Sequence, residues 1–472
     1  MSLRDGPRDE CGVFGAYAPE HDVSRLAYFA LYALQHRGQE SAGIATSESG
    51  HIMTLRDLGL VSQVFDEAKL RALTGSMVLG HVRYSTTGSS AWENAQPIYR
   101  SDRREVALAH NGNLINAVEL HSELRERGVS FRSTSDSEII AAMLSTHEAD
   151  TIEEALADVM PRLEGAFSTV VMTRDSVVAF RDGAGLRPLA LGRLDDRYCV
   201  ASESCAFDII GAEFMRDVEP GEMVSLGERG LETRRIIEGE RRAFCVFEHI
   251  YFARPDSRLE GTRAQVSRGR MGEILWRESP IDADLVIAVP DSGNPAANGY
   301  SSASGIPKDD GLIKNRYVAR TFIQPGQELR KHGLRMKFNP VPEVVSGKRI
   351  VVVDDSIVRG NTTRQIVSML RDAGAAEVHM RISAPPIRHT CHYGIDMSTT
   401  EEMVAYGRSV AEVADELGCE SLAYLSLEGV YEAIGAGRDT HCDACFTGEY
   451  PLERSSSANG KFALEELAVV RA

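Results

Sequence analysis

An apolar run from Arg349 to Val353 ends in two adjacent carboxylates, and a glycine-bearing loop and a helix-like segment follow them. Continuous apolar runs of this kind are typical of strands buried on both faces of a parallel sheet. Leu285 to Val289 forms a second such run. Helical spacing extends from Thr362 to Ala373, and Gly374 follows where a helix commonly ends. The sequence therefore predicts a parallel sheet with a ligand site at the carboxyl ends of its strands.

The loop after Val353 has the composition of a phosphate-binding site. Asp354 and Asp355 can accept hydrogen bonds from ribose hydroxyls or hold Mg²⁺. Backbone amides from Ser356 to Thr363 and the start of the following helix can cradle a phosphate, and Gly360 permits a close backbone approach. The alternative for a bare Asp-Asp pair is a solvated acidic turn. The order of strand, acid pair, glycine, two threonines and helix favours the phosphate site.

Charge and cysteine content limit the class of protein. The chain has 472 residues and a formal net charge of -17, which argues against nonspecific binding to nucleic acid or to an anionic membrane. No apolar run approaches the roughly 18 residues of a membrane span, and residues 1–10 are polar, so we expect a cytoplasmic protein. Eight cysteines are too few for a disulfide scaffold, which favours a nucleophile or metal ligands.

The first half of the chain has a different pattern from the second. Strand-like runs such as Phe167 to Met172 alternate with helical stretches such as Ser137 to Met143, which indicates mixed α+β layers. The charged turn from Glu238 to Arg242 suggests a boundary near residue 240. We therefore expect one domain over residues 11–240 and a second over residues 241–472.

A basic segment stands out within the acidic chain. Between residues 314 and 337 the only acid is Glu328, whereas the bases are Lys314, Arg316, Arg320, Arg330, Lys331, Arg335 and Lys337. Such a cluster suits a polyanionic substrate with a diphosphate leaving group. The alternatives are a solvated basic face or an RNA-binding patch.

The segment from Val351 to Val367 resembles the type I phosphoribosyltransferase motif, specifically that of the amidophosphoribosyltransferase family. Val289 to Gly293 resembles the family's pyrophosphate-binding turn, and Lys314 through Gln324-Pro325 to Pro340 resembles its mobile catalytic lid. The resemblance implies that Mg²⁺, one ion per subunit, lies at Ser292, Asp354 and Asp355. It implies that phosphoribosyl diphosphate is bound by Lys314, Arg316, Tyr317, Lys337, Asp354, Asp355, Ser356, Arg359, Gly360, Asn361, Thr362 and Thr363. The chain departs from the family pattern at Asn361, Ala319 and Gly326, which affects the fine geometry of the loops.

Four further motifs resemble the N-terminal-nucleophile glutaminases of that family: Cys11 to Gly15, Gly80 to Gly88, His110 to Leu114 and Ser135 to Glu138. In such enzymes the α-amine of the nucleophile is the base, so residues 1–10 would be a propeptide cut between Glu10 and Cys11. The resemblance implies that Asn111 and Gly112 form the oxyanion hole. It also implies that glutamine is bound by Arg83, Thr86 and Asp136. Taken singly, these residues favour a surface arginine, an Asn-Gly turn and a helix N-cap. Four motifs in the family's order make coincidence improbable.

Cys442 and Cys445 form a C-x-x-C pair, and Cys245 and Cys391 lie upstream. Four thiolates can bind a four-iron four-sulfur cluster or Zn²⁺, and spacing alone leaves both open. Residues 244–255 and 442–448 resemble the iron-sulfur branch of the family, which implies one structural 4Fe-4S cluster per subunit. A redox-active dithiol is the alternative for the C-x-x-C pair. The three other downstream cysteines are expected to be buried or inert: Cys199, Cys205 and Cys419.

The resemblance covers nearly the whole chain, from Cys11 to about Pro451. It implies an αββα sandwich followed by an α/β phosphoribosyltransferase domain with a parallel sheet. The implied reaction hydrolyses glutamine through a Cys11 thioester and passes the ammonia to 5-phosphoribosyl 1-diphosphate. The products would be 5-phosphoribosylamine, glutamate and diphosphate, at the first committed step of purine synthesis. Family members are homo-oligomers, dimers or tetramers, inhibited by purine nucleotides, and both properties are expectations here.

Three rival interpretations remain open. Another glutamine amidotransferase, such as a glucosamine-phosphate synthase, would share the first half, but Asp354-Asp355 and the basic segment argue against it. A nonenzymatic regulator that binds phosphoribosyl diphosphate would have no use for Cys11 and its companion motifs. An inactive relic should lack a catalytic residue, and none is missing.

Overall fold

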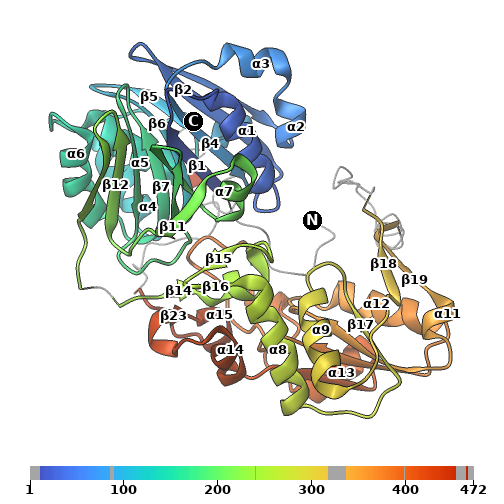
Figure 1. Cartoon of the computed structure of the whole chain (residues 1–472). Helices are drawn as coiled ribbons and strands as arrows, with labels where there is room; N and C mark the ends of the chain where they lie inside the picture. Colours follow the sequence, from blue (N-terminus) through green and yellow to red (C-terminus); the bar gives the residue numbers. More distant parts are fainter. Residues whose placement is uncertain are drawn as a thin grey trace.

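The computed structural model describes residues 11–84, 90–239, 241–316, 336–397, 399–452 and 464–465. These residues form two layered bodies, the blue-to-green part and the yellow-to-red part of Figure 1. The predicted propeptide (residues 1–10), Thr86, Tyr317 and most of the predicted lid lie outside the described residues.

The first body contains two antiparallel sheets. One sheet consists, in spatial order, of β11 (Glu213–Asp217), β9 (Ala190–Leu194), β10 (Arg197–Ala201), β1 (Gly12–Tyr17), β4 (Met77–Arg83), β2 (Ser41–Glu48) and β3 (His51–Leu58). The helices that share its outer core are α1 (Val23–Ala33), α2 (Val61–Val64), α3 (Glu67–Ala72) and α7 (Cys205–Ile210).

The other sheet packs against the first through a core that includes Val13, Leu79, Ala109 and Val170. Its strands are β13 (Gly230–Arg235), β12 (Glu222–Gly227), β8 (Ser176–Arg181), β7 (Gly165–Met172), β6 (Glu105–Leu114) and β5 (Ile98–Ser101). Its outer face is covered by α4 (Ala117–Glu126), α5 (Asp136–Thr146) and α6 (Ile152–Val159). Two 3-10 helices complete this body, η1 (Trp92–Asn94) and η2 (Met160–Arg162). The predicted αββα sandwich is confirmed.

The second body is built on a parallel sheet, as predicted from its apolar runs. Its strands are β17 (Leu285–Ala288), β20 (Arg349–Asp354), β21 (Glu377–Ile382) and β22 (Ser421–Tyr424). One face packs against α8 (Ala264–Glu278), α9 (Asn294–Ser304) and α14 (Leu427–Ile434). The other face packs against α11 (Pro342–Val345), α12 (Asn361–Asp372) and α13 (Val410–Leu417). Because both faces are covered, the strands carry no polar alternation. Helix α12 begins and ends one residue earlier than its spacing predicts.

Short elements lie around the sheet of the second body. Three small strand pairs occur: β14 (Phe244–Cys245) with β23 (His441–Cys442), β15 (Arg258–Leu259) with β16 (Thr262–Arg263), and β18 (Leu312–Lys314) with β19 (Phe338–Pro340). The short helices are the π-helix η3 (Glu248–Phe252), η4 (Thr400–Glu402), η5 (Arg438–Thr440) and α15 (Ala444–Thr447).

The two bodies share a small core. Ile115 and Leu186 of the first body pack with Tyr393 of the second, and Cys391 and Cys442 lie against this cluster. Near the end of the chain, Leu464 returns to the first body and packs in the core beneath α4, α5 and α6. Within the described residues, every helix is too short or too polar to cross a lipid bilayer.

Candidate active sites

Cys11 lies directly before β1, in the wall of a small pocket, and its side chain is buried. Its thiol donates a hydrogen bond to the carbonyl oxygen of Tyr84 at 3.3 Å. The other lining residues are Arg83, Tyr84, Gln96, His110, Gly112, Ser135, Asp136 and Ser137. Burial raises the pKa of the Cys11 thiol to about 11, and the nearby charge of Arg83 offsets this only in part. The thiol is therefore protonated near neutral pH and needs a base to become a nucleophile.

Arg83 and Asp136 place opposite charges in this pocket. Arg83 is the last residue of β4, and its Nη1 lies 3.9 Å from Glu40 Oε2. Asp136 is the first residue of α5 and accepts a hydrogen bond from the backbone N–H of Leu114 at 3.0 Å. Burial opposes ionisation of Asp136, but His110 and backbone N–H groups outweigh it and lower the pKa of the carboxyl. A guanidinium and a carboxylate in the lining of one small pocket suit a zwitterionic ligand.

Asn111 and Gly112 are adjacent residues of β6. Asn111 is buried, and its Nδ2 has no acceptor among the residues that the structure describes. A buried amide donor without a partner is unfavourable, so an acceptor supplied by a substrate would satisfy it. Gly112 has φ +152°, and a Cβ there would lie 2.0 Å from the carbonyl oxygen of Ala166. Only glycine fits this position, and Gly112 is part of the pocket lining.

Sequence reasoning assigned no role to four polar residues of the pocket lining, Gln96, His110, Ser135 and Ser137. Gln96 Oε1 accepts from the backbone N–H of His110 at 2.7 Å, and its Nε2 donates to Ser137 Oγ at 2.9 Å. His110 Nδ1 is 3.2 Å from the same hydroxyl. This network fixes the strand that carries Asn111 relative to the start of α5. His110 and Ser135 stand inside predicted motifs, whereas Gln96 has no local signal.

The second candidate site lies at the carboxyl ends of β17 and β20. A Cβ at Gly293 would lie 2.5 Å from the carbonyl oxygen of Val353, so the loop that carries Ser292 packs directly against the end of β20. Asp354 and Asp355 follow on, and both are buried. Burial and the neighbouring charge of Asp355 raise the pKa of Asp354 well above its usual value. A bound cation would relieve this repulsion, because it favours both carboxylates in their ionised form.

The loop after the acid pair continues into α12. The Ser356 hydroxyl donates to Asp355 Oδ2 at 2.6 Å. Gly360 has φ +78° and caps the start of α12, so Asn361, Thr362 and Thr363 form the first turn of a helix. The N-terminus of a helix attracts phosphate through its backbone N–H groups and its dipole.

Three of the predicted basic residues of the second site, Lys314, Arg316 and Lys337, lie on or beside the β18–β19 ribbon. Lys314 Nζ is 2.6 Å from Asp291 Oδ2, and Arg316 Nη2 is 3.6 Å from Asp291 Oδ1. Lys337 precedes Phe338, which pairs with Lys314 across the ribbon. The charge of Lys337 acts to lower the pKa of Asp354, against the larger effect of burial. Arg359 is paired with Glu402 at 2.8 Å. The structure thus brings most of the predicted phosphoribosyl residues to one edge of the sheet.

The four predicted cluster cysteines converge beside the shared core. Cys245 and Cys442 are direct partners in the parallel pairing of β14 and β23. The pKa of Cys445 is raised well above its usual value by burial first and then by the nearby thiols of Cys245, Cys442 and Cys391. In the part of the chain that the structure describes, no three His, Cys, Asp or Glu side chains form a group that could hold a metal ion. Cys199, Cys205 and Cys419 are buried, as predicted.

The geometry agrees with the comparisons to known proteins. The family described as "Glutamine amidotransferase domain" matches residues 81–208, which include Arg83, Asn111 and Asp136. An amidophosphoribosyltransferase of Synechococcus elongatus is 52% identical over 455 residues, 95% of this chain and 92% of that protein. The Archaeoglobus fulgidus protein of the same name is 50% identical over 94% of this chain and 98% of its own.

A solved structure matches the fold over both bodies. The glutamine phosphoribosylpyrophosphate amidotransferase from Bacillus subtilis, complexed with ADP and GMP, superimposes with a TM-score of 0.91 at 44% identity. The match covers 96% of this chain and 99% of that one.

Proposed function

The chain belongs to the amidophosphoribosyltransferase family, and on this premise we propose how its own residues carry out the reaction. Glutamine is hydrolysed at Cys11, and the ammonia attacks carbon one of 5-phosphoribosyl 1-diphosphate. Diphosphate leaves, and the products are 5-phosphoribosylamine and glutamate, at the first committed step of purine biosynthesis. We divide the chain into a propeptide (1–10), a glutaminase domain (11–240) and a phosphoribosyltransferase domain (241–472).

The observation that carries this proposal is the charged pocket at Cys11. Arg83 binds the α-carboxylate of glutamine and Asp136 binds its α-ammonium, which directs the side-chain amide toward the thiol. Thr86 is proposed as a further contact to glutamine. The thiol attacks the amide carbon to give a tetrahedral intermediate, whose oxyanion the Asn111 side chain and the Gly112 N–H stabilise. The intermediate then expels ammonia, which takes up the proton given up by the thiol, and leaves the Cys11 thioester. Water then releases glutamate.

The base for this step is proposed to be the α-amine of Cys11, which exists only after residues 1–10 are removed. An α-amine has an unperturbed pKa of roughly 7.7–8.0, close to working pH, whereas burial holds the pKa of the thiol at about 11. Neutral His81 is a poor candidate, because burial lowers its pKa to about 3.

We expect glutamine hydrolysis to accelerate as pH rises through roughly 7 to 8, because the α-amine must lose its proton before it can accept one from the thiol. Above that range the rate should stay flat, because the pKa of the thiol is about 11 and the thiol does not titrate there. The measurement is kcat/KM for glutamate release across pH. A rising limb near roughly 6.5, the ordinary pKa of imidazole, would indicate a histidine base instead.

In the acceptor site, Ser292, Asp354 and Asp355 are proposed to hold one Mg²⁺. The raised pKa of Asp354 supports this, because a carboxyl pair that repels itself is a good cation ligand. When bound, Mg²⁺ neutralises charge on the diphosphate leaving group. The first turn of α12 and the loop before it, Ser356 to Thr363, bind the 5-phosphate. Lys314, Arg316, Lys337 and Arg359 supply positive charge toward the diphosphate, and Tyr317 is proposed as a further contact to phosphoribosyl diphosphate.

Cys245, Cys391, Cys442 and Cys445 are proposed to bind a structural 4Fe-4S cluster, one per subunit. The donor set fits, since four thiols converge, two of them buried and two partly buried, and a four-iron cluster takes one thiolate per iron. Zn²⁺ is the second candidate, because four thiolates are also a common zinc ligand set.

Two further properties extend the proposal. Purine nucleotides are proposed to inhibit the enzyme, because the matched Bacillus subtilis structure is a complex with ADP and GMP. A cytoplasmic homo-oligomer is proposed from the family resemblance.

The test of the proposed function uses protein purified without oxygen. We expect an intact mass that lacks residues 1–10, visible absorbance from thiolate-bound iron, and glutamate and diphosphate released in equal amounts when both substrates are present. Glutamate release without diphosphate release would support a glutaminase with a different acceptor. Binding of phosphoribosyl diphosphate by a protein that retains residues 1–10 and hydrolyses no glutamine would support the nonenzymatic regulator.

A further inference from the structure

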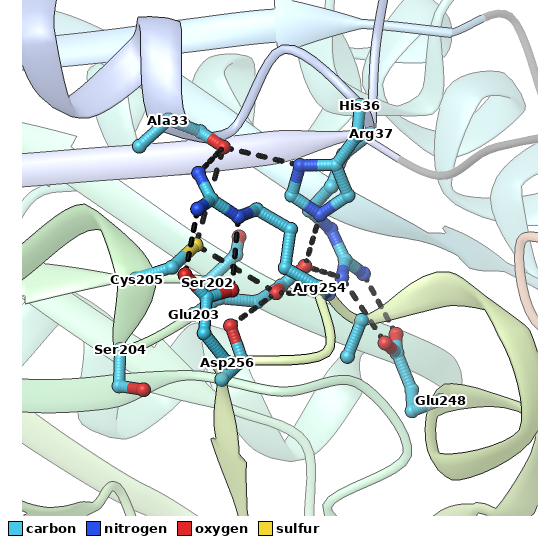
Figure 2. Close-up of polar contacts among 12 residues, drawn as sticks. Ala33, His36, Arg37, Ser202, Glu203, Ser204, Cys205, Glu248, Arg254 and Asp256 are labelled. Carbon is cyan, nitrogen blue, oxygen red and sulfur yellow. Dashed lines mark hydrogen bonds and ion pairs between the residues drawn. The ribbon is translucent and has the colours of Figure 1, made fainter. Parts of the chain in front are cut away.

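A single buried arginine connects the nucleophile to both bodies of the protein. Arg37 follows α1, and its Nε donates to the carbonyl oxygen of Cys11 at 3.1 Å. Its Nη1 donates to Glu203 Oε1 at 2.5 Å, and its Nη2 donates to Glu248 Oε1 at 2.7 Å. Glu203 belongs to the first body, whereas Glu248 is the first residue of η3 in the second (Figure 2). All three side chains are at most 1% exposed.

Glu203 is bound from both bodies. His36 Nε2 lies 2.7 Å from its Oε1, on the same side as Arg37. Its Oε2 accepts from the backbone N–H of Arg254 at 2.9 Å and from the Ser257 hydroxyl at 2.6 Å. Burial acts to raise the pKa of Glu203, but His36, Arg37 and Ser257 outweigh it and hold the pKa far below its usual value. The carboxylate therefore stays ionised and keeps Arg37 in place.

Glu248 is in turn held rigidly by the second body, which is called the acceptor body from here on because it carries the proposed acceptor site at β17 and β20. Arg268, on α8, donates to the carbonyl oxygens of His249 at 2.9 Å and Ala253 at 2.8 Å, which fixes η3 to that helix. Helix α8 packs backbone to backbone on α9, since a Cβ at Gly272 would lie 1.9 Å from the carbonyl oxygen of Ala296. Helix α9 begins directly after the loop that carries Ser292. A continuous buried path thus runs from the acceptor site to the carbonyl of Cys11.

We propose that Arg37 is a positioning residue for glutamine hydrolysis and that Glu248 supplies the acceptor body's hold on it. The inference rests on the proposed function of Cys11. Arg37 fixes the peptide plane of the nucleophilic residue and so the direction in which its Sγ points. Without the second carboxylate, the guanidinium turns toward Glu203 alone, and its bond to the Cys11 carbonyl weakens. Glutamine hydrolysis therefore requires that the two bodies be docked.

The test is Glu248→Gln in the processed full-length enzyme, because glutamine keeps the shape of the side chain and removes its charge. We expect kcat for glutamine hydrolysis to fall about 10- to 100-fold, the cost of misplacing a reacting group by about 1 Å. KM for glutamine should change less than about twofold, because Arg83 and Asp136 bind the amino acid. The phosphoribosyl transfer that uses free ammonia should stay within about twofold, since it does not involve Cys11.

Arg37→Lys provides a second variant, since it keeps the positive charge but loses the planar fork that reaches two carboxylates and a carbonyl. It should show the same selective loss of kcat. Asp256→Asn is the matched control: it breaks the 2.6 Å pair with Arg254 in the same junction without touching Arg37, and should leave both activities unchanged.

The outcomes separate the inference from its premise. Unchanged glutamine kcat in both Glu248→Gln and Arg37→Lys would overturn the inference while the function stands. Equal losses of glutamine- and ammonia-dependent activity would mean that the junction only stabilises the fold, and would also overturn it. If the wild-type enzyme hydrolyses no glutamine, the proposed function fails and the inference fails with it.

Discussion

Replacing Cys11 with alanine is expected to lower glutamine-dependent formation of phosphoribosylamine by about 10⁴-fold or more, the usual loss when a catalytic nucleophile is removed. Transfer from free ammonia should remain within about twofold, because the acceptor site at β20 does not contain Cys11. The two rates are measured as diphosphate release with glutamine or with ammonium as the nitrogen source. The small volume change at a buried site should cost little stability compared with this chemical effect.

The same variant tests processing. The thiol is proposed to cut the bond before residue 11, so Cys11→Ala protein should keep residues 1–10, and Cys419→Ala should lose them as the wild type does. Cys419 is also a buried thiol, with its pKa raised to about 11 by burial, but it is not among the residues that line the pocket. Glutamine-dependent activity in Cys11→Ala above about 1% of wild type would refute the assignment of Cys11.

Asp355→Asn is expected to lower both glutamine- and ammonia-dependent transfer by about 10²- to 10³-fold, the typical cost of removing one electrostatic contributor to a transition state. The substitution removes a charge from the proposed Mg²⁺ site and relieves the repulsion that raises the pKa of Asp354. Glutamate release measured without phosphoribosyl diphosphate should be retained, because the pocket at Cys11 is intact. The Mg²⁺ concentration for half-maximal activity should rise.

Asp284→Asn is the matched control for that prediction. Asp284 pairs with Arg349 at 3.0 Å, at the opposite end of β17 and β20, and carries the same charge in the same sheet. It should leave both transfer rates and the Mg²⁺ requirement unchanged. If Asp355→Asn transfers nitrogen at the wild-type rate, the metal and ribose roles of the acid pair are wrong.

The sequence could predict elements whose burial is local. Arg349 to Val353 reads as a doubly buried strand because both of its faces are apolar, and the structure covers both faces with helices. The acid pair after it was predictable as a ligand site for a different reason, since ligands bind at the carboxyl ends of parallel strands. Strands β1 and β4 are buried on both faces too, yet they pair antiparallel, so burial on both faces predicts a covered strand but not the direction of its pairing.

The Arg37 junction could not be predicted, because its contacts join residues 166 and 211 positions apart in the sequence. One signal was present: Glu248 stands in the apolar run from Phe244 to Phe252, and a charge that is expected to be buried needs a partner. Nothing local identifies that partner. The convergence of Cys391 on Cys442 and Cys445 was likewise implied only by family resemblance.

The return of Leu464 to the core beneath α5 has a consequence for dividing the protein. The chain leaves the first body near residue 239, completes the second, and comes back, so the acceptor body is inserted between two parts of the glutaminase fold. A glutaminase fragment that stops at residue 240 would expose the site of Leu464 to water. A circular permutation that joined the last segment ahead of residue 11 would place chain directly before the proposed nucleophile, and that segment would have to be cut away to free the α-amine that the proposed mechanism uses.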